Sequence, residues 1–540
     1  MAEERLDASG RDRRKPLWAF WMCITYKHIA KGMTTVKDFI DRRIVAEYCQ
    51  RFNAQDEEPY QGDVPNARAE DFLIAEIPRF ECPDPVFQEI WYFRWWSFRK
   101  HIRRTPFGRI ILEFMPDVPW AGAFNTINCP AAHQLREARW LKDKGIAEEY
   151  LSFWLNPEAK AAVRSYTFGV ASAALDVVAV TGKDSLALEL YPALCANYAK
   201  WKETHLGPDG LFRQQDGRDG MECSIGGSGY RVTINSCMAA EAMALAAIGR
   251  RVGDTQQAEL YRQEAEQLRQ LIETRLWNDE AEFFMTRREE DGAFVQVREL
   301  HGYTPWYYFP KMAEKYDLAW RQLLDPEGFL APFGPTTAER RHPGFQLDRS
   351  GHECQWNGPS WPFATSVTLT GLARLLHERT SAEIGCRGYF ETLTCYTRSH
   401  YLRENGQVIP WIDENIHPFT GEWLAREILR SWERAGIKSR AWFHERGKDY
   451  SHSTYADLII TGLCGINPDL PGKVRVAPLL PAECWDYFLL EGLWLRGHEL
   501  ALQFDRDGSR YQRGRGLALY VDGTEAARCE DGIGVLEVAL

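Results

Sequence analysis

The sequence predicts a mainly helical protein in which helical hairpins close into a ring, followed by a small β-rich region at the C-terminal end. Between about Val86 and Leu470, stretches of roughly 12 to 20 residues with helical apolar spacing alternate with loops rich in glycine and proline. After Pro468, short alternating runs at Leu500 to Asp505 and Leu517 to Val521 are separated by glycine-containing turns. A helical solenoid is the alternative architecture, but no repeat of about 30 to 47 residues is present.

Three parts are expected along the chain: a lead-in segment over residues 1–85, a helical catalytic domain over 86–470 and a β-rich appendage over 471–540. Long helices joined by long loops are what a closed ring of hairpins requires, because the loops at one end can converge on an axial pit. The predicted helices are Val86 to Arg103, Ala131 to Phe153, Ala161 to Thr181, Ser185 to His205, Thr233 to Val252, Thr255 to Leu276, Pro362 to Thr380, Ser381 to Tyr401 and Tyr455 to Cys464.

Composition narrows the class of function. The chain has 540 residues, of which 45% are hydrophobic and 26% charged, as in a folded, water-soluble protein. The net charge is −11, so the chain lacks the positive field that nucleic-acid binding requires. No apolar run is long enough to predict a membrane span. Thirteen cysteines without a Cys-x-x-Cys pair indicate reduced thiols and a cytoplasmic location. The oligomeric state stays open, with a homo-oligomer among the options.

Aromatic residues make up 13% of the chain and include 20 tryptophans. Such rings stack on the CH faces of sugars, and they also serve as core filler in large helical domains. A carbohydrate substrate is therefore one of two explanations for this composition.

The first unusual loop is Gly207 to Tyr230, between two predicted helices, with seven glycines that let the backbone approach a ligand closely. Asp216, Asp219 and Glu222 lie in it as candidate proton donors. A phosphate-binding loop is a poor match, because no strand precedes the glycines and no lysine follows them. A plain surface loop is the alternative interpretation.

The second unusual loop is Glu353 to Pro362, which leads into an apolar helix. Its Trp-Asn-Gly-Pro-Ser-Trp sequence places Trp356 and Trp361 at a helix entrance, where a sugar hydroxyl can accept from an indole N–H. Pro362 is equally ordinary helix-start chemistry.

The third unusual loop is Pro410 to Trp423, which crowds Asp413, Glu414 and Glu422 among aromatic residues. Crowded, partly desolvated carboxyl groups have raised pKa values and are typical of acid–base sites, although a solvated acidic loop is the alternative. No zinc or calcium motif is present, so the sequence calls for neither a metal nor another cofactor.

These motifs resemble a known family. Gly220-Met221-Glu222-Cys223-Ser224 is similar to a Gly-Met-Asp-Asn-Ser-Pro motif, Gln355 to Trp361 to a Tyr-Trp-Arg-Gly-Pro-Ile-Trp motif, and Glu414 to Glu422 to a Glu-Asn-Tyr-Asn-Pro-x-Thr-Gly-Glu motif. The chain, over roughly Trp91 to Pro468, thus resembles the six-hairpin (α/α)6-barrel glycosidases, in particular mannosylglycerate hydrolase and the α-glucosidases of glycoside hydrolase family 63. The C-terminal strands are similar to the β-sandwich that closes many α-L-rhamnosidases.

The resemblance implies an (α/α)6 toroid and an inverting glycoside hydrolase, with Glu222 as general acid and Glu414 as general base. Such a pair stands about 6.5 to 9.5 Å apart, with room for the attacking water. Glu222 replaces the Asp of the family, and the Ile-Gly-Gly-Ser-Gly run that follows is not the usual continuation, which points to a different sugar or linkage. Asp219 is the alternative acid. Asn415 is expected to keep Glu414 charged.

The expected substrate is a small α-glucoside or α-mannoside, cleaved from its end. The residues expected to bind it are Trp95, Arg99, Trp120, Asn125, Asp219, Gln355, Trp356, Asn357, Trp361, Trp411 and Glu422, with Arg99 as a clamp for a carboxylate. An α-L-rhamnosidase or L-arabinofuranosidase on the same fold is an alternative. A polysaccharide lyase and a non-catalytic carbohydrate-binding protein are alternatives of other classes.

Overall fold

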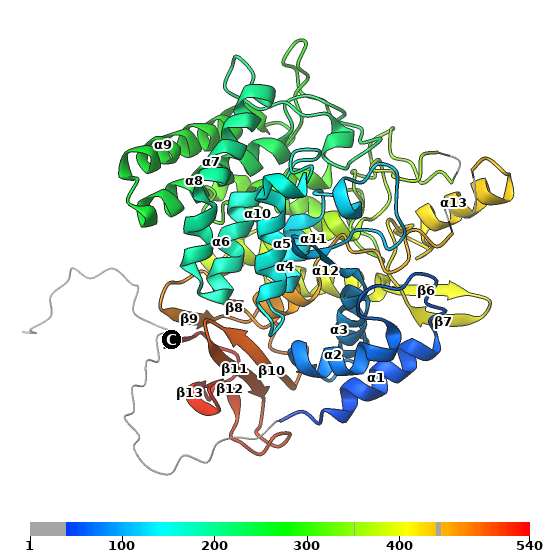
Figure 1. Cartoon of the computed structure of the whole chain (residues 1–540), viewed down its shortest axis with the longest axis vertical. Coiled ribbons are helices and arrows are strands. Elements are labelled where there is room, and N and C mark those ends of the chain that lie inside the picture. The colour runs from blue at the N-terminus through cyan, green and yellow to red at the C-terminus, as the bar shows by residue number, and fades with distance from the viewer. Residues whose placement is uncertain (1–38, 350, 439–443) are drawn as a thin grey trace, which may run out of the picture. The chain divides into compact units, whose positions relative to one another are not determined.

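The computed structural model describes residues 39–349, 351–438 and 444–540, and helices are its main regular element (Figure 1). In chain order the helices are α1 (Arg43–Ala54), α2 (Ala69–Glu76), α3 (Pro85–Phe98), α4 (Ala131–Ala138), α5 (Gly145–Leu155), α6 (Val170–Thr181), α7 (Asp184–His205), α8 (Val232–Val252), α9 (Thr255–Leu271), α10 (Thr304–Tyr308), α11 (Pro362–Glu378), α12 (Cys386–Ser399) and α13 (Leu424–Arg434).

Local sequence accounts for where several helices begin and end. The Asp84 side chain accepts hydrogen bonds from the backbone N–H groups of Val86 (2.9 Å) and Phe87 (3.4 Å) and so caps α3. Gly182 and Gly253 adopt left-handed backbone angles (φ 74° and 84°) directly after α6 and α8, a conformation that ends helices and favours glycine.

The predicted helices differ from the observed ones in several places. The expected helix over Ala131 to Phe153 is two helices, α4 and α5, because Asp143 accepts from the backbone N–H of Gly145 (3.0 Å) and starts a new one. Helix α13 lies where no helix was predicted. Its acidic and basic residues hide the helical apolar spacing.

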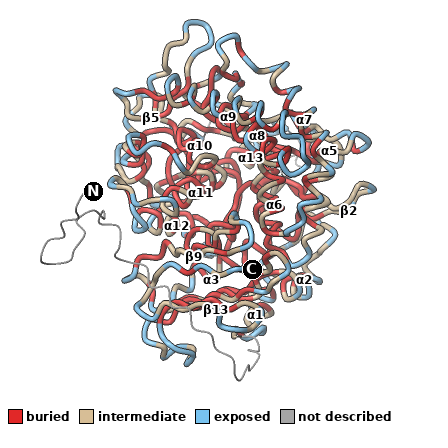
Figure 2. Tube along the Cα trace, turned by 90° about the vertical axis from the view of Figure 1, so that its left-hand side faces the viewer, coloured by how far each residue is buried: buried red, intermediate tan, exposed pale blue. Residues whose placement is uncertain are grey.

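Helix α8 is the central helix of the core. It packs against α6, α7, α9 and α10, and its residues are largely buried (Figure 2). Within the described ranges it is the one helix long and apolar enough to cross a membrane, which the sequence had not led us to expect, but 89% of its apolar window is buried inside the protein. That burial is typical of a core helix.

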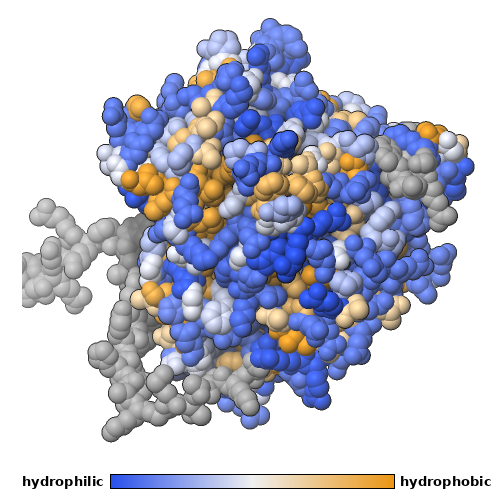
Figure 3. Space-filling view, viewed as in Figure 1, coloured by the Kyte–Doolittle hydropathy of each residue, from blue (hydrophilic) through white to orange (hydrophobic). Residues whose placement is uncertain are grey.

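The molecular face drawn in Figure 3 is mostly hydrophilic, with small apolar patches.

The C-terminal region forms two antiparallel sheets, drawn in orange and red in Figure 1. The five-stranded sheet has the order β1-β10-β11-β12-β13, and the three-stranded sheet the order β14-β9-β8. The strands are β1 (Arg79–Glu81), β8 (Ile466–Asn467), β9 (Lys473–Val476), β10 (Tyr487–Leu495), β11 (His498–Asp505), β12 (Gly516–Val521), β13 (Thr524–Cys529) and β14 (Leu536–Ala539).

Two of these strands, β11 and β12, coincide with the predicted alternating runs, whereas β1 comes from the segment expected to be a lead-in. It pairs with β10, and Arg79 forms a buried ion pair with Glu491 of that strand (2.9 Å). The N-terminal part of the described chain therefore completes the C-terminal sheet. The division into three parts at residues 85 and 470 stays a prediction.

Short β-hairpins interrupt the helical region, and two of them position the loops that carry Glu113 and Glu414. Strands β2 (Ile102–Thr105) and β3 (Gly108–Ile111) pair just before Glu113, and β6 (Tyr401–Glu404) and β7 (Gln407–Pro410) pair just before Glu414. A further hairpin joins β4 (Trp277–Asn278) and β5 (Phe283–Phe284). The first two hairpins deliver carboxyl groups to the candidate site.

Candidate active site

Backbone hydrogen bonds join the three loops that the sequence singled out. The N–H of Trp356 donates to the carbonyl oxygen of Glu222 (3.1 Å), which attaches the second loop to the first. Ser360 and Ile416 exchange two backbone hydrogen bonds, both 3.0 Å long, which attach the second loop to the third. Segments about 200 residues apart in the chain are thus fixed side by side, and their acidic side chains gather around one place.

Glu222 lies in the glycine-rich loop between α7 and α8 and is partly buried. Burial raises the pKa of Glu222 to about 7, and the negative charges of Glu414 and Asp216 act in the same direction. Among the described residues no other side chain donates a hydrogen bond to this carboxyl group. The group is therefore held near the point of protonation at neutral pH, as a proton donor requires.

Glu414 has different surroundings. Its side chain is fully buried, and one carboxylate oxygen accepts from two nitrogens of Arg446, Nη2 at 2.6 Å and Nε at 3.2 Å. The thiol of Cys354 donates to its other oxygen (3.3 Å), and Arg446 also reaches Glu353 (3.4 Å). A guanidinium stays charged at every relevant pH, so Arg446 gives the Glu414 carboxyl group charge-assisted hydrogen bonds that fix its position, which suits a general base.

Arg446, not Asn415, is the charged partner of the Glu414 carboxyl group, which differs from the expectation from the sequence. The Asn415 amide donates to the carbonyl oxygen of Glu353 (2.7 Å) and accepts from the N–H of Ala425 (3.1 Å), so it fixes the backbone of two loops.

Glu113 is a third carboxyl group at the site. It is buried, and one of its oxygens lies 2.7 Å from the hydroxyl of Tyr450 and 3.1 Å from Nε2 of His452. Burial raises the pKa of Glu113 to about 8, and the charges of Glu414 and Glu222 add to the effect. Its second oxygen, Oε2, is buried and has no partner in the described part of the chain. A neutral carboxyl group with one unused oxygen suits a hydrogen bond to a substrate hydroxyl.

The other acids of the third loop lie differently. Asp413 is buried and accepts from the indole of Trp411 (3.3 Å) and from the backbone N–H of Glu414 (2.9 Å), and burial raises the pKa of Asp413 to about 7. Glu422 is nearly half exposed and binds Thr420 (2.9 Å) and Arg349. Glu422 therefore holds the turn of the loop.

Asp219, the alternative acid, has both oxygens occupied. It accepts from Arg231 Nε (2.5 Å), from the hydroxyl of Thr167 (2.6 Å) and from that of Thr233. A buried carboxylate with three donors, one of them a guanidinium, has no oxygen left to present a proton to a leaving group. Asp219 fixes the shape of the loop, and Glu222 is the better candidate.

Three of the expected binding residues are packed in the core or hydrogen-bonded elsewhere. Trp95 is buried in α3 against Trp91. Arg99 is fully buried and binds Asn66 and the carbonyl oxygen of Val64 (2.5 Å), so its guanidinium is not offered to a carboxylate ligand. Asn125 donates to the carbonyl oxygen of Pro116 (3.0 Å) and closes a turn. These three side chains are left out of the site that we propose below.

The tryptophans of the second loop form a stacked pair. The rings of Trp356 and Trp361 lie 4.6 Å apart at 16°, and both are buried. The Trp361 indole donates to the carbonyl oxygen of Gln355 (2.7 Å), whereas that of Trp356 has no partner among the described residues. The Gln355 amide donates to the carbonyl oxygen of Asp348 (2.7 Å), and Asn357 lies 3.4 Å from the side chain of Gln346. Trp356 therefore retains a donor for a ligand.

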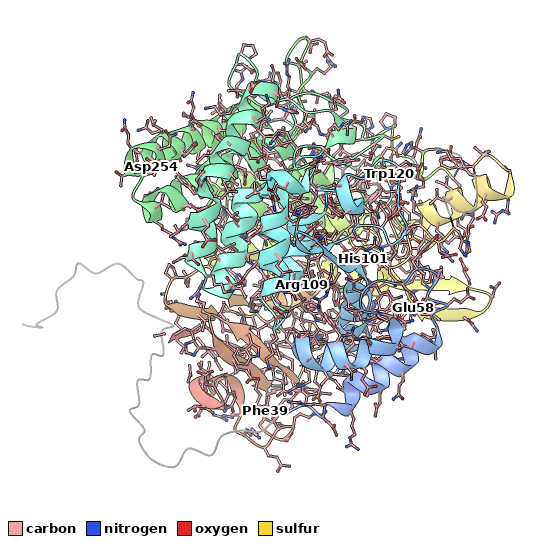
Figure 4. All side chains as sticks on the ribbon, viewed as in Figure 1. Phe39, Glu58, His101, Arg109, Trp120 and Asp254 are labelled. Carbon is pink, nitrogen blue, oxygen red and sulfur yellow. The ribbon has the colours of Figure 1, made fainter. Side chains whose placement is uncertain are left out.

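Trp120 and Trp411 both lie near arginines. Trp120, labelled in Figure 4, is 39% exposed, and its ring faces the guanidinium of Arg446 at 5.0 Å. Trp411 is buried under Arg426 (4.5 Å) and holds Asp413 through its indole. Trp120 thus offers an accessible aromatic face beside the carboxyl groups, whereas Trp411 supports the loop from behind.

A buried ion cluster fixes the loop that carries Arg446. Lys100 bridges Asp56 (2.6 Å) and Asp449 (2.7 Å), all three almost fully buried. The ring of His101, labelled in Figure 4, lies 2.6 Å from the carbonyl oxygen of Asp449. Removing one member of such a cluster leaves an uncompensated buried charge. The cluster therefore positions Arg446, three residues away.

Sequence reasoning missed Glu113, Cys354, Arg446, Tyr450 and His452 as site residues. Glu113 carried a usable signal, because it is a lone acid directly after the apolar run Ile110-Ile111-Leu112. Arg446 carried none, since its partner is 32 residues away and nothing in the local pattern links the two.

Within the described ranges no group of three or more His, Cys, Asp or Glu side chains is arranged to hold a metal ion, and the cysteines of those ranges are all free.

The geometry agrees with a family comparison. A family model described as the mannosylglycerate hydrolase MGH1-like glycoside hydrolase domain matches residues 123–453, a range that includes both Glu222 and Glu414. The chain belongs to this family and is a glycoside hydrolase.

Solved structures extend the likeness over more of the chain. One named sialidase is 35% identical with a TM-score of 0.85, and the match covers 93% of this chain and 45% of that one. A GH78 rhamnosidase of Bacillus sp. GL1 is 14% identical (TM-score 0.51, 83% of this chain, 42% of that one). An α-L-rhamnosidase from Dictyoglumus thermophilum is 9% identical (TM-score 0.51, 86% and 49%). The chain spans less than half the length of each, and the two rhamnosidases show the fold alone.

Proposed function

We propose that the chain hydrolyses a glycosidic bond with inversion, Glu222 acting as general acid and Glu414 as general base. The observation that carries this proposal is the difference between the two carboxyl groups: burial raises the pKa of Glu222 to about 7, while Glu414 is paired with Arg446. Neighbouring carboxyl groups in opposite protonation states are what this reaction needs.

The roles follow from the two environments. Glu222 gives its proton to the oxygen of the leaving group as the bond to the sugar breaks. Glu414 takes a proton from a water molecule that attacks the opposite face of the sugar, and Arg446 stabilises the ionised carboxylate until then. Glu113 holds a sugar hydroxyl through Oε2, and Trp120 lies against the face of the sugar or its leaving group.

We also propose that the helices form the six-hairpin (α/α)6 toroid expected from the sequence. The convergence of loops from successive helices on one set of carboxyl groups supports this arrangement, as does the fold shared with the two rhamnosidases.

The proposed substrate is a glycoside such as an α-glucoside or α-mannoside. We propose no sialidase activity for this chain, because sialidases use a tyrosine nucleophile and the present site offers a pair of carboxyl groups. The part of the sialidase structure that this chain matches is under half of it.

The test is a panel of nitrophenyl α-glucosides, α-mannosides, α-L-rhamnosides, L-arabinofuranosides and sialosides together with natural disaccharides. Proton NMR determines the anomeric configuration of the sugar that is released first. We expect one sugar to be cleaved with inversion, Glu414→Gln to lose activity on both kinds of substrate, and Glu222→Gln to lose activity on the natural disaccharide. Retention of configuration, or near-normal turnover in both variants, contradicts the proposal.

A further inference from the structure

A second cavity lies beside the Glu222 loop. Its volume is about 590 Å³, and its lining is mostly polar. Part of the lining comes from the glycine-rich loop itself, and the rest from neighbouring segments. The residues that matter here are Arg164, His205, Arg213, Gln215, Arg218 and Glu289.

Positive charge exceeds negative charge in this cavity. Arg213 pairs with Glu289 (2.5 Å), the one acid in the lining. Arg164 donates only to the amide oxygen of Asn197 (2.8 Å), and Arg218 lies over the ring of Tyr166 (5.9 Å). Neither of these two arginines has a carboxylate partner among the residues that the structure describes. The cavity thus holds two uncompensated guanidinium groups in a protein whose net charge is −11.

One short turn separates this cavity from the proposed acid. The turn Asp216–Arg218 places Gly217 against Glu222, since a Cβ atom at Gly217 would lie 3.6 Å from Cγ of Glu222. Arg218, the next residue, faces the cavity. A general acid stands on the leaving-group side of the bond that it cleaves. The cavity adjoins the loop that carries this acid, so we assign it to the leaving-group side, where the rest of a longer substrate would continue.

We propose that this cavity is a second carbohydrate subsite, which takes a carboxylate-bearing sugar residue, a uronate, of a longer substrate. Arg164 and Arg218 present planar forks that match a carboxylate, and Gln215 and Ser228 supply partners for sugar hydroxyls. The placement of the cavity on the leaving-group side rests on the proposed function, whereas the binding of a uronate in the cavity does not depend on it.

Binding is measured by isothermal titration calorimetry in the full-length Glu222→Gln variant, so that no turnover occurs. The probes are tri-galacturonate and the neutral maltotriose. We expect tri-galacturonate to lose about tenfold in affinity on Arg218→Ala and again on Arg164→Ala, because each removes a charge-assisted contact. Maltotriose binding should stay unchanged. Arg262→Ala, which removes an exposed arginine of α9 outside the cavity, is the matched control and should change neither.

Glu289→Gln tests the same idea in the opposite direction. It removes the one acid of the lining and frees Arg213, so tri-galacturonate should bind severalfold more tightly. Arg218→Lys should recover only part of the affinity, because lysine keeps the charge and loses the fork. Both residues are exposed enough that the variants should fold, which circular dichroism checks.

Three results would overturn the proposal. Tri-galacturonate binding could be insensitive to both arginine substitutions. Maltotriose could lose as much affinity as the uronate does. Inorganic sulfate could displace tri-galacturonate at a similar concentration, which would make the cavity a site for free anions. The outcome is separate from that of the proposed function. Normal turnover of a glycoside in Glu222→Gln and Glu414→Gln would reject the acid–base pair, and the binding of tri-galacturonate would then be compared between the arginine variants in the otherwise unchanged chain.

Discussion

The loops that carry Glu222 and Glu414 place the same side chain in opposite settings. The first loop is rich in glycine and leaves the Glu222 carboxyl group partly exposed, with no donor from another side chain that the structure describes. The third loop buries Glu414 completely and surrounds it with Arg446 and Cys354. Identity of the residue therefore does not decide which glutamate gives a proton and which takes one. The neighbours decide it.

The largest expected effect comes from removing each carboxyl group in turn. Glu222→Gln and Glu414→Gln should each lower kcat about 10²- to 10⁴-fold on a natural disaccharide. On a nitrophenyl glycoside Glu222→Gln should lose much less, because nitrophenolate leaves without a proton, while Glu414→Gln should lose as much as before. Steady-state kinetics on the two substrates measure this. Glu422→Gln is the exposed control, and equal losses for both leaving groups would contradict the assignment.

Arg446→Met should be the next largest change. Glu414 would become a buried carboxylate without its main partner, which destabilises a protein by about 3–5 kcal/mol. The Glu414 carboxyl group would also lose the partner that fixes its position, so kcat should fall. Urea unfolding and steady-state kinetics test the two effects. Arg430→Met, which removes a partly exposed ion pair with Glu404, should do neither.

The pH dependence of activity tests the other glutamate. Since the pKa of Glu222 is about 7 and the acid must carry its proton, kcat/KM should fall as the pH rises above about 7. Asp216→Asn removes a nearby negative charge and should shift this basic limb to lower pH, by roughly half a unit or less. A basic limb that stays in place in Asp216→Asn, or that lies far above pH 7, would argue against Glu222.

Stability should depend on pH through Glu113. Its pKa is raised from about 4.5 to about 8 in the folded protein, so the unfolded chain releases this proton first as the pH rises. The contribution of Glu113 to stability is complete below about pH 4.5 and is lost as the pH rises through about 8. In Glu113→Gln the melting temperature should therefore fall less between pH 5 and pH 9 than in the wild type. An equal fall would show that Glu113 is ionised in the folded state.

The smallest expected effect concerns Trp120. Trp120→Phe reduces an accessible aromatic face beside the carboxyl groups and should raise KM a fewfold, with kcat nearly unchanged. Trp95→Phe, in the buried core of α3, should lower stability and leave KM as it was. The reverse pattern would place the sugar away from Trp120.

The sequence predicted what is local. Helical spacing gave most helices, and three motifs gave the loops that the backbone joins through Trp356, Ser360 and Ile416. Trp95 and Arg99, expected to bind substrate, are buried, and the apolar residues on every face of Val86 to Phe98 already indicate a buried helix. The sequence missed Arg446 and Tyr450, because their contacts with Glu414 and Glu113 depend on how distant loops pack.

The pairing of β1 with β10 has a consequence for how the chain is made. Arg79 and its partner Glu491 are 412 residues apart, so at a synthesis rate of roughly 5 to 20 residues per second the first strand waits about 20 to 80 s for the second. During that interval β1 and the buried arginine have no sheet to join. Glu491 also accepts from the backbone N–H groups of Phe39 and Ile40. Deleting residues 39–81 or stopping synthesis before β10 would therefore damage the same sheet.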